Sequence, residues 1–330
     1  IFARTCDLYT WLVRGSRLAV IEDREQIIPG CAAVKPTLVN GVPYFYERIY
    51  RRLTEANKLG PIAPGGQTHL QLLLGGEVRA CCSGGAALPN HVAEFFWQQG
   101  MPLVQGYGLT ESSPVITTAT PDHNKIGTVG RAIEGVEVKI ADDGEILTRG
   151  PHVMLGYWRQ PAETEMAIRE GWLYTGDLGQ LDANGYLQIT GRKKELIVTA
   201  GGKNIAPVFL ESLLAEEPLI LQVVVIGEGR KYLTALIVPN PETLRGEIIL
   251  RQIPVRSAAE ALAHPAVLDL YRQRINARLA AVSAEEQIQR FALLPRGFTI
   301  EEEELTPTLK LRRSVVHQHF APQIEALYAD

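Results

Sequence analysis

Cysteine is scarce in this sequence of 330 residues, which has only Cys6, Cys31, Cys81 and Cys82. No two of them have the spacing of a zinc knuckle, and the neighbours Cys81 and Cys82 are badly placed for a common structural disulfide. These absences argue against a disulfide framework and against a structural zinc site. We expect the cysteines to be buried free thiols.

Long hydrophobic runs and an excess of charge of one sign are also missing. No uninterrupted apolar stretch approaches the roughly 20 residues needed to cross a bilayer, and residues 1–6 do not read as a charged region followed by an apolar signal segment. The formal net charge is −4 and the 33 basic residues are scattered, so nothing favours a nucleic-acid partner. The sequence predicts a cytoplasmic protein that does not bind nucleic acid.

Apolar residues, by contrast, are plentiful. A hydrophobic content of 46% over 330 residues is ample for more than one core, so we expect two folded units. The chain begins without Met, in what reads as mid-domain sequence. We therefore expect a piece of a longer protein.

In the first half, short β-rich runs alternate with helical ones. Residues 17–22, 35–40 and 78–83 are predicted as strands, and residues 44–56 and 89–99 as helices. This alternation predicts a layered α/β unit.

From about residue 127 the pattern changes to hairpins, with turn residues at 142–144 and 182–185. We expect a β-rich subdomain over residues 127–190. The charged stretch that follows marks a domain boundary, which gives a first domain over residues 1–191 and a second over residues 192–330.

The second domain has the mixed order of elements expected of a small α+β fold. A helix begins at Pro207, strands are predicted at residues 221–226 and 232–238, and four apolar residues share one face of a later helix: Val267, Tyr271, Ile275 and Leu279. The acidic run at residues 301–304 is interpreted as a solvated surface turn rather than a metal cluster.

Residues 105–111 read Gln-Gly-Tyr-Gly-Leu-Thr-Glu, which superficially suggests a dinucleotide-binding loop. The position of the third glycine in that fingerprint holds Glu111, and a bare carboxylate would repel a pyrophosphate. A bridging Mg²⁺ would offset this repulsion, because the ion prefers oxygen ligands. Tyr107 offers a ring that could cover an adenine.

Several other short motifs are weak when taken singly. Gly84-Gly85 could be only a turn, Asp177 only a cap or turn residue, and Lys310 only a solvated lysine. Their order along the chain is more specific than any one of them. The series comprises residues 83–86, 105–111, 144–146 with 149–150, 174–177, 191–192, 201–205 and 307–310.

This ordered series resembles that of the adenylate-forming (AMP-binding) superfamily, and residues 35–47 and 305–313 are most similar to the long-chain fatty acyl-CoA synthetases. The resemblance runs from Ile1 to the C-terminus. It implies a partial layered α/β domain with a β-rich subdomain, followed by a small mobile α+β domain. It also implies that a fatty acid reacts with ATP to give an acyl-adenylate, from which coenzyme A displaces AMP.

The resemblance further implies roles for individual residues. Asp177 would hold the ribose hydroxyls, Glu111 would help to hold Mg²⁺, and Lys310 would bridge the carboxylate and the α-phosphate, with Thr110 and Glu111 as further catalytic residues. The implied ATP- or AMP-binding residues are Gly84, Gly85, Ala86, Gln105, Gly106, Tyr107, Gly108, Thr110, Asp177, Arg192 and Lys194. The second domain would swing about Lys194 and present a CoA-binding face at Gly201, Gly202 and Lys203.

The sequence also departs from the family. The Ser/Thr/Gly-rich loop that ends in Pro-Lys-Gly and grips the β- and γ-phosphates is absent, and Val198 stands where some relatives have a lysine. We therefore expect the isolated chain to be inactive. The alternatives are a nucleotide- or acyl-binding fragment without turnover and an adenylating enzyme that loads a carrier protein. Peripheral membrane contact stays open, and the sequence does not indicate an oligomeric state.

Overall fold

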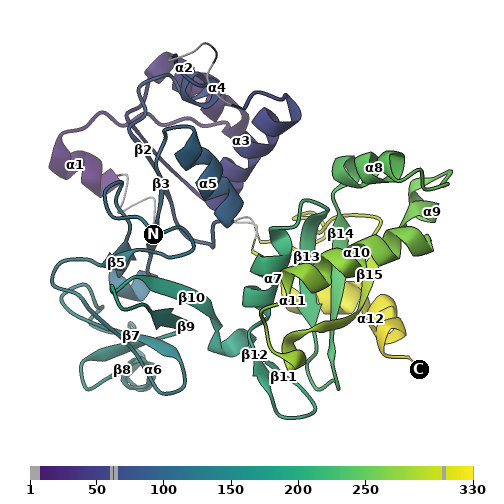
Figure 1. Ribbon diagram of the computed structural model, residues 1–330. Coiled ribbons are helices and arrows are strands. Elements are labelled where there is room, and N and C mark those ends of the chain that lie inside the picture. The colour runs from purple at the N-terminus through teal and green to yellow at the C-terminus, as the bar shows by residue number, and fades with distance from the viewer. Residues whose placement is uncertain (1–7, 60–61, 63–65, 307–309, 330) are drawn as a thin grey trace. The chain divides into compact units, whose positions relative to one another are not determined.

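A computed structural model describes residues 8–59, 62, 66–306 and 310–329 of the chain. The chain divides into two compact units, Ile1–Ile189 and Thr190–Asp330 (Figure 1). The domain bounds inferred from the sequence, 1–191 and 192–330, stay a prediction. Both helices and strands occur in each unit, which confirms the predicted α/β class.

A five-stranded sheet organises the first unit. Its first three strands are parallel to one another, and each of the last two runs antiparallel to the strand before it. In spatial order the strands are β1 (Leu38–Gly41), β2 (Ala80–Ser83), β3 (Leu103–Tyr107), β4 (Thr117–Thr118) and β5 (Arg131–Ala132).

Helix α3 (Pro43–Glu55) confirms the helix predicted at 44–56, and it begins with proline at a position where no amide donor is needed. The Tyr46 hydroxyl of this helix lies 2.8 Å from the carbonyl oxygen of Val39 and 2.9 Å from that of Cys82, which joins α3 to β1 and β2. The Tyr46 ring packs edge-on against Phe96 of α5 (Asn90–Gln98). The other helical elements that precede β3 in the chain are α1 (Thr10–Arg14), α2 (Ile27–Val34) and α4 (His69–Leu73), with the 3₁₀ turn η2 (Arg24–Gln26).

Two strand predictions in this unit need correction. Residues 17–22 form no strand and are almost wholly exposed, because no neighbouring strand among the described residues pairs with their short apolar run. The strand predicted at 35–40 begins only at Leu38, since Lys35 adopts a left-handed conformation that ends α2. Cys31 and Cys81 are buried free thiols as expected, Cys82 is half-buried, and Cys6 lies outside the described residues.

The predicted β-rich part follows as a second sheet in the order β10-β9-β7-β6, with β8 paired to β9. The turn at residues 142–144 joins β6 to β7, and the Asp143 carboxylate there accepts a hydrogen bond from the Glu145 amide. Both predicted turns are confirmed. The elements are β6 (Glu137–Ile140), β7 (Glu145–Arg149), α6 (Pro161–Ala167), β8 (Ile168–Arg169), β9 (Trp172–Leu181) and β10 (Leu187–Arg192).

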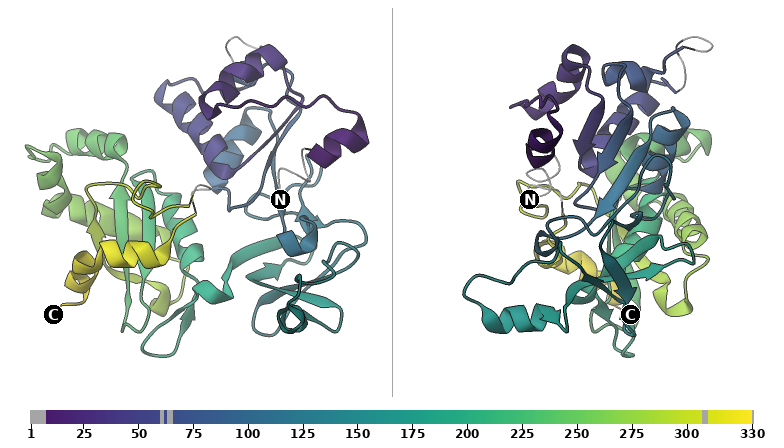
Figure 2. Two further views of the ribbon diagram at one scale, coloured as in Figure 1. Left: turned by 180° about the vertical axis from the view of Figure 1, so that it is seen from behind. Right: turned by 90° about the vertical axis from the view of Figure 1, so that its left-hand side faces the viewer.

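A three-stranded sheet forms the centre of the second unit. The middle strand, β14 (Leu233–Pro239), runs antiparallel to β13 (Ile220–Ile226) and parallel to β15 (Ile288–Leu293). Every residue of β14 is buried, because helices cover both faces of the sheet. Figures 1 and 2 show α7 (Pro207–Ala215) and α10 (Pro265–Arg278) on one face, with α11 (Arg313–His319) and α12 (Ala321–Tyr328) on the other.

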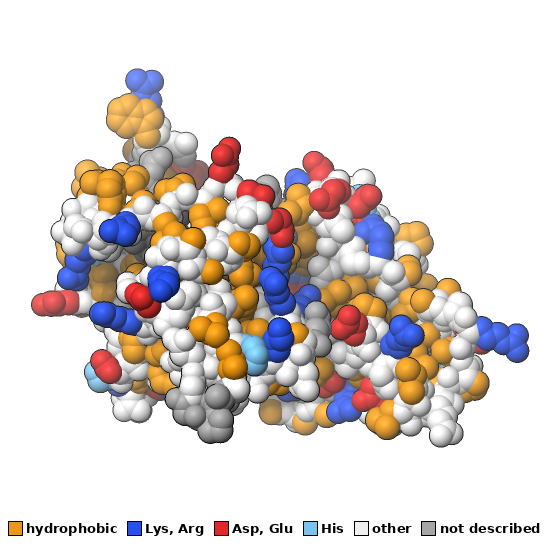
Figure 3. All heavy atoms as spheres, turned by 90° about the horizontal axis from the view of Figure 1, so that it is seen from above, with side chains coloured by type: hydrophobic (Ala, Val, Ile, Leu, Met, Phe, Trp, Pro, Cys, Tyr) orange, Lys and Arg blue, Asp and Glu red, His pale blue; other side chains and the backbone are white. Residues whose placement is uncertain are grey.

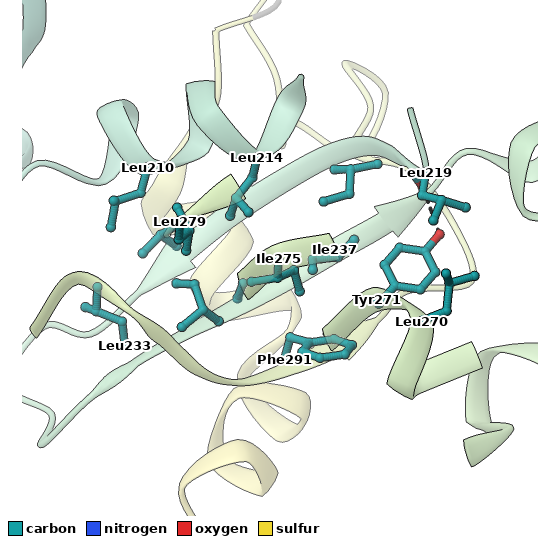
Figure 4. Packing of buried hydrophobic residues seen from close by; sticks show 14 of the residues in the cluster. Leu210, Leu214, Leu219, Leu233, Ile237, Leu270, Tyr271, Ile275, Leu279 and Phe291 are labelled. Carbon is teal, nitrogen blue, oxygen red and sulfur yellow. Dashed lines mark hydrogen bonds between the residues drawn. The ribbon is translucent and has the colours of Figure 1, made fainter. Parts of the chain in front are cut away.

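The larger core of this unit lies between the sheet and the helices α7 and α10 (Figure 4). The four residues predicted to share a helix face, Val267, Tyr271, Ile275 and Leu279, all belong to it. The buried Tyr271 hydroxyl donates to the Leu219 carbonyl oxygen at 2.8 Å, so its polar end is satisfied. The remaining elements are η4 (Lys193–Glu195), β11 (Ile197–Val198), β12 (Asn204–Ile205), α8 (Pro241–Leu250), α9 (Ala258–Ala263) and η5 (Ala284–Glu286).

The acidic run at 301–304 is only partly a solvated turn. Its first three residues are exposed, but the side chain of Glu304 has no exposed surface. The prediction is wrong at Glu304 because Arg296 and His319 surround its carboxylate with hydrogen bonds.

Acidic and basic side chains of the described residues both lie on the face shown in Figure 3. No helix in the described part of the chain is long and apolar enough to cross a membrane.

Candidate active site

The carboxyl ends of β1, β2 and β3 lie at one edge of the sheet, because these three strands are parallel. Residues 84–88 leave this edge after β2, and residues 108–113 leave it after β3. Ligands of α/β proteins bind outside the carboxyl ends of parallel strands. The structure therefore brings two of the predicted nucleotide-binding motifs to the edge where a ligand is expected.

The glycine turn after β2 borders open space. Gly85 has a φ of +84°, and a Cβ atom placed on it would have no neighbour within 4 Å. Gly85 and Ala86 are exposed, whereas Gly84 is buried. A ligand could thus approach the backbone of Gly85 and Ala86 closely.

Gln105 links the two loops through its own side chain. Its Oε1 accepts a hydrogen bond from the Leu88 amide at 3.2 Å, and its Nε2 lies 3.5 Å from the Thr128 carbonyl oxygen as a donor. The sequence predicted a place beside the adenine for Gln105 and did not indicate this structural role. Contact with adenine stays a prediction.

Gly108 is required by close backbone packing. A Cβ atom on it would lie 2.0 Å from the carbonyl oxygen of Pro114, whereas the nearest atom to a Cβ on Gly106 is the carbonyl oxygen of Thr117 at 3.6 Å. The first distance is far below contact and the second is an ordinary one.

We accordingly expect Gly108→Ala to lower the free energy of unfolding by about 1–3 kcal/mol, because the backbone must move to make room. Gly106→Ala is the matched control and should leave stability nearly unchanged. Urea unfolding followed by circular dichroism measures both. Equal stabilities of the two variants would show that the loop relaxes around the added methyl group.

Thr110 and Glu111 lie on a 3₁₀ turn, η3 (Thr110–Ser112). The Ser112 hydroxyl of this turn accepts a hydrogen bond from the Leu109 amide at 2.8 Å. Thr110 is exposed. Glu111 is half-buried, and its Oε1 accepts a hydrogen bond from the Tyr157 hydroxyl at 3.0 Å. Partial desolvation, followed by the hydrogen bond to Glu111, raises the pKa of the Tyr157 hydroxyl above its ordinary value.

Glu111 is the predicted metal ligand. Among the described residues no group of three or more His, Cys, Asp or Glu side chains could hold an ion. Mg²⁺ does not need such a group, since it is often bound by one or two carboxylates together with substrate phosphates and water. A single carboxylate beside the ligand edge fits that mode of binding.

Asp177 lies within strand β9 and is neither a cap nor a turn residue. It is 3% exposed, and its Oδ2 accepts a hydrogen bond from the Tyr107 hydroxyl at 2.7 Å. Two motifs separated by 70 residues thus meet side chain to side chain. Tyr107 is itself buried, and its hydroxyl holds this oxygen of the carboxylate in place.

Glu145 is a supporting residue for which the sequence alone indicated no separate role. It is buried, and its Oε1 accepts a hydrogen bond from the Gly176 amide at 2.8 Å. This hydrogen bond fixes the backbone next to Asp177. The signal was present in the motif at 144–146, but only the fold shows what the carboxylate holds.

The other predicted residues belong to the second unit. Arg192 and Lys194 are exposed at the end of β10 and in η4. Lys194 lines a shallow groove together with Glu195, Glu228, Arg313 and His317, among others.

The predicted CoA-binding residues lie in the turn between β11 and β12. All of them are exposed, and the Lys203 amide donates to the Thr199 hydroxyl at 3.2 Å. The Lys203 ammonium lies 3.8 Å from the Glu285 carboxylate.

Lys310 is exposed, and two hydrogen bonds join it to Thr306. The Thr306 amide donates to the Lys310 carbonyl oxygen at 2.8 Å. The Lys310 amide donates to the Thr306 hydroxyl at 3.0 Å. The residues 307–309 of the predicted motif lie outside the described residues.

A glycine turn, a paired tyrosine and aspartate and a nearby glutamate thus lie beside the carboxyl ends of parallel strands, an arrangement typical of nucleotide-binding α/β proteins. Comparison with protein families places it more closely. Residues 1–158 match the family described as AMP-binding enzyme, and residues 194–330 match the AMP-binding enzyme C-terminal domain. The chain belongs to the AMP-binding enzymes.

Among curated relatives, the chain is similar to the long-chain-fatty-acid–CoA ligase FadD15 of Mycobacterium bovis, with 38% identity over 93% of this chain and 57% of the relative. It is 38% identical to the long-chain-fatty-acid–CoA ligase heimdall of Drosophila melanogaster, over 76% of this chain and 43% of that protein. The chain thus spans little more than half of the FadD15 relative.

Solved structures share the fold. The anthranilate CoA ligase AuaEII in complex with anthranoyl-AMP matches with a TM-score of 0.66 and 21% identity, over 92% of this chain and 55% of that one. The A-PCP didomain of carboxylic acid reductase from Segniliparus rugosus in complex with AMP matches with a TM-score of 0.69 and 23% identity, over 94% of this chain and 44% of that one.

Proposed function

We propose that this chain serves in the ATP-dependent ligation of a long-chain fatty acid to coenzyme A. The fatty carboxylate oxygen attacks the α-phosphorus of ATP and pyrophosphate leaves. The thiol of CoA, having lost its proton, then attacks the acyl carbonyl and AMP leaves. The observation that carries this proposal is the meeting of Tyr107 and Asp177 next to the ligand edge, in a chain whose relatives include long-chain-fatty-acid–CoA ligases.

The residues of the first unit would bind the nucleotide. Asp177 is an acceptor-only group when ionised, which suits the two ribose hydroxyls as donors. Gly84, Gly85, Ala86 and residues 105–108 would line the adenine side, and the exposed Thr110 hydroxyl would contact a phosphate. Mg²⁺, when bound, would neutralise phosphate charge, with Glu111 as its ligand from this chain.

The residues of the second unit would act in turn. Lys310 would bring its ammonium between two anions that must meet, the fatty carboxylate and the α-phosphate. Arg192 would reach the ribose or a phosphate. Rotation about Lys194 would then remove Lys310 and present Gly201, Gly202 and Lys203 to CoA.

The test is fatty-acid-dependent ATP–pyrophosphate exchange, together with acyl-CoA formation, in the complete gene product that contains this chain. Palmitate should support both reactions and acetate should support neither well. Exchange without fatty acid specificity would contradict the proposed substrate class.

The acyl acceptor needs its own comparison. One relative, 33% identical over 77% of this chain, is the long-chain-fatty-acid–[acyl-carrier-protein] ligase AEE15 of Arabidopsis thaliana. Offering CoA and a phosphopantetheinylated carrier protein in parallel distinguishes the two acceptors, and faster transfer to the carrier protein would replace CoA in the proposal.

A further inference from the structure

Glu304 is a buried carboxylate with a full set of partners. Arg296 contacts both of its oxygens, at 2.7 Å and 2.8 Å, and the Thr299 amide donates to Oε2 at 3.2 Å. The His319 Nδ1 atom lies 3.0 Å from Oε1. Burial alone would raise the pKa of Glu304, but the hydrogen bonds from Arg296 and His319 outweigh it and lower the pKa, so the side chain is ionised at neutral pH.

These partners come from separate segments. Arg296 follows β15, and His319 lies in the last turn of α11. The carboxylate therefore ties the segment that follows β15 to α11, the helix that comes after Lys310 in the sequence. A bidentate, charge-assisted pair of this kind fixes orientation as well as distance.

From Glu304 a short ladder of backbone contacts runs toward Lys310. The Arg312 amide donates to the Glu304 carbonyl oxygen at 2.8 Å, Leu305 and Leu311 form a β-bridge, and Thr306 pairs with Lys310. Glu304 thus lies at the base of this ladder and Lys310 at its far end.

The returning strand of the ladder is anchored independently. Arg313 makes a bidentate ion pair with Glu211 of α7, with contacts of 2.8 Å and 2.5 Å. The Glu211 carboxylate also accepts a hydrogen bond from the Val225 amide of β13 at 2.8 Å. With its return fixed to the core of the unit, the ladder is held on its outgoing side by the Glu304 carboxylate and by the Leu305 amide, which donates to the Thr299 carbonyl oxygen at 2.9 Å.

We infer that Glu304, clamped by Arg296 and His319, is a positioning residue that fixes the loop presenting Lys310 for the adenylation step. This inference rests on the proposed function of Lys310. Glu304 touches no substrate in this scheme and acts only through the lysine.

The first test is kinetic. Glu304→Gln keeps the shape of the side chain but removes its charge and places an amide donor against other donors. In the complete gene product it should slow acyl-adenylate formation about 10- to 100-fold, the scale of a misplaced catalytic group. Thioester formation from supplied acyl-adenylate should not change. Glu302→Gln, in the exposed part of the same acidic run, is the matched control and should change neither step.

A double variant separates positioning from general damage. If Glu304 acts through Lys310, Lys310→Ala combined with Glu304→Gln should be no slower in adenylation than Lys310→Ala alone. Additive losses would overturn the inference. If Lys310→Ala itself leaves adenylation unchanged, the proposed role of Lys310 fails instead.

Hydrogen exchange tests the clamp without activity. The amides of Thr306, Lys310 and Arg312 should exchange faster in Glu304→Gln than in the unchanged protein, and Glu302→Gln should have no such effect. Equal exchange rates would overturn the inference. Should Glu304→Gln fail to fold, Arg296→Lys keeps the charge, loses the bidentate contact and carries the same predictions at smaller size.

Discussion

Replacing Lys310 by alanine is expected to slow acyl-adenylate formation by about two to three orders of magnitude, the usual scale for removing one preorganised electrostatic group. The same change should spare thioester formation from supplied acyl-adenylate. The two steps differ because Lys310 is proposed to lie at the reacting anions only during adenylation. Its exposed position in a loop held by backbone contacts with Thr306 suits a group that is presented to a site and then withdrawn.

Both half-reactions need to be measured separately for this variant. Pyrophosphate exchange reports on adenylation, and the release of AMP from acyl-adenylate after CoA is added reports on thioester formation. Lys231→Ala, another exposed lysine of the same unit, is the control and should affect neither step. Equal losses in the two half-reactions of Lys310→Ala would contradict the proposed alternation between domain positions.

Local features of the fold could be predicted from the sequence because neighbouring residues determine them. The hairpin turn at 142–144 and the helix that begins at Pro207 follow from turn chemistry and from proline at a first helical position. The face of α10 follows from its helical period. In each case the signal lies within a few residues of the element.

The errors arise where the outcome depends on distant residues. The apolar run at 17–22 has the composition of a strand, but a strand also needs a partner to pair with, and this run has none among the described residues. Glu304 belongs to an acidic run that looks solvated, and its burial depends on His319, which is 15 residues away. Composition and period cannot show such pairings.

The candidate site divides in the same way. The order of the motifs indicated the residues and the family, but the sequence did not show that Tyr107 and Asp177 touch or that Gln105 supports the loop after β2. These contacts decide which side chains face a ligand and which support the ones that do.

Asp177→Ala should weaken ATP binding by about 100-fold or more, because two charge-assisted hydrogen bonds to the ribose are each worth about 1.5–3 kcal/mol. The change also leaves the Tyr107 hydroxyl without the carboxylate to which it donates, so the measured loss includes the loss of this internal hydrogen bond.

Tyr107→Phe separates the two contributions. It removes the same internal hydrogen bond but keeps the carboxylate for the ribose, and it should weaken ATP binding by roughly 10-fold or less. Calorimetric titration of ATP into both variants gives the dissociation constants, and urea unfolding shows whether each is folded. An Asp177→Ala protein that is folded and binds ATP as tightly as Tyr107→Phe would assign Asp177 to support of the sheet edge rather than to the ribose.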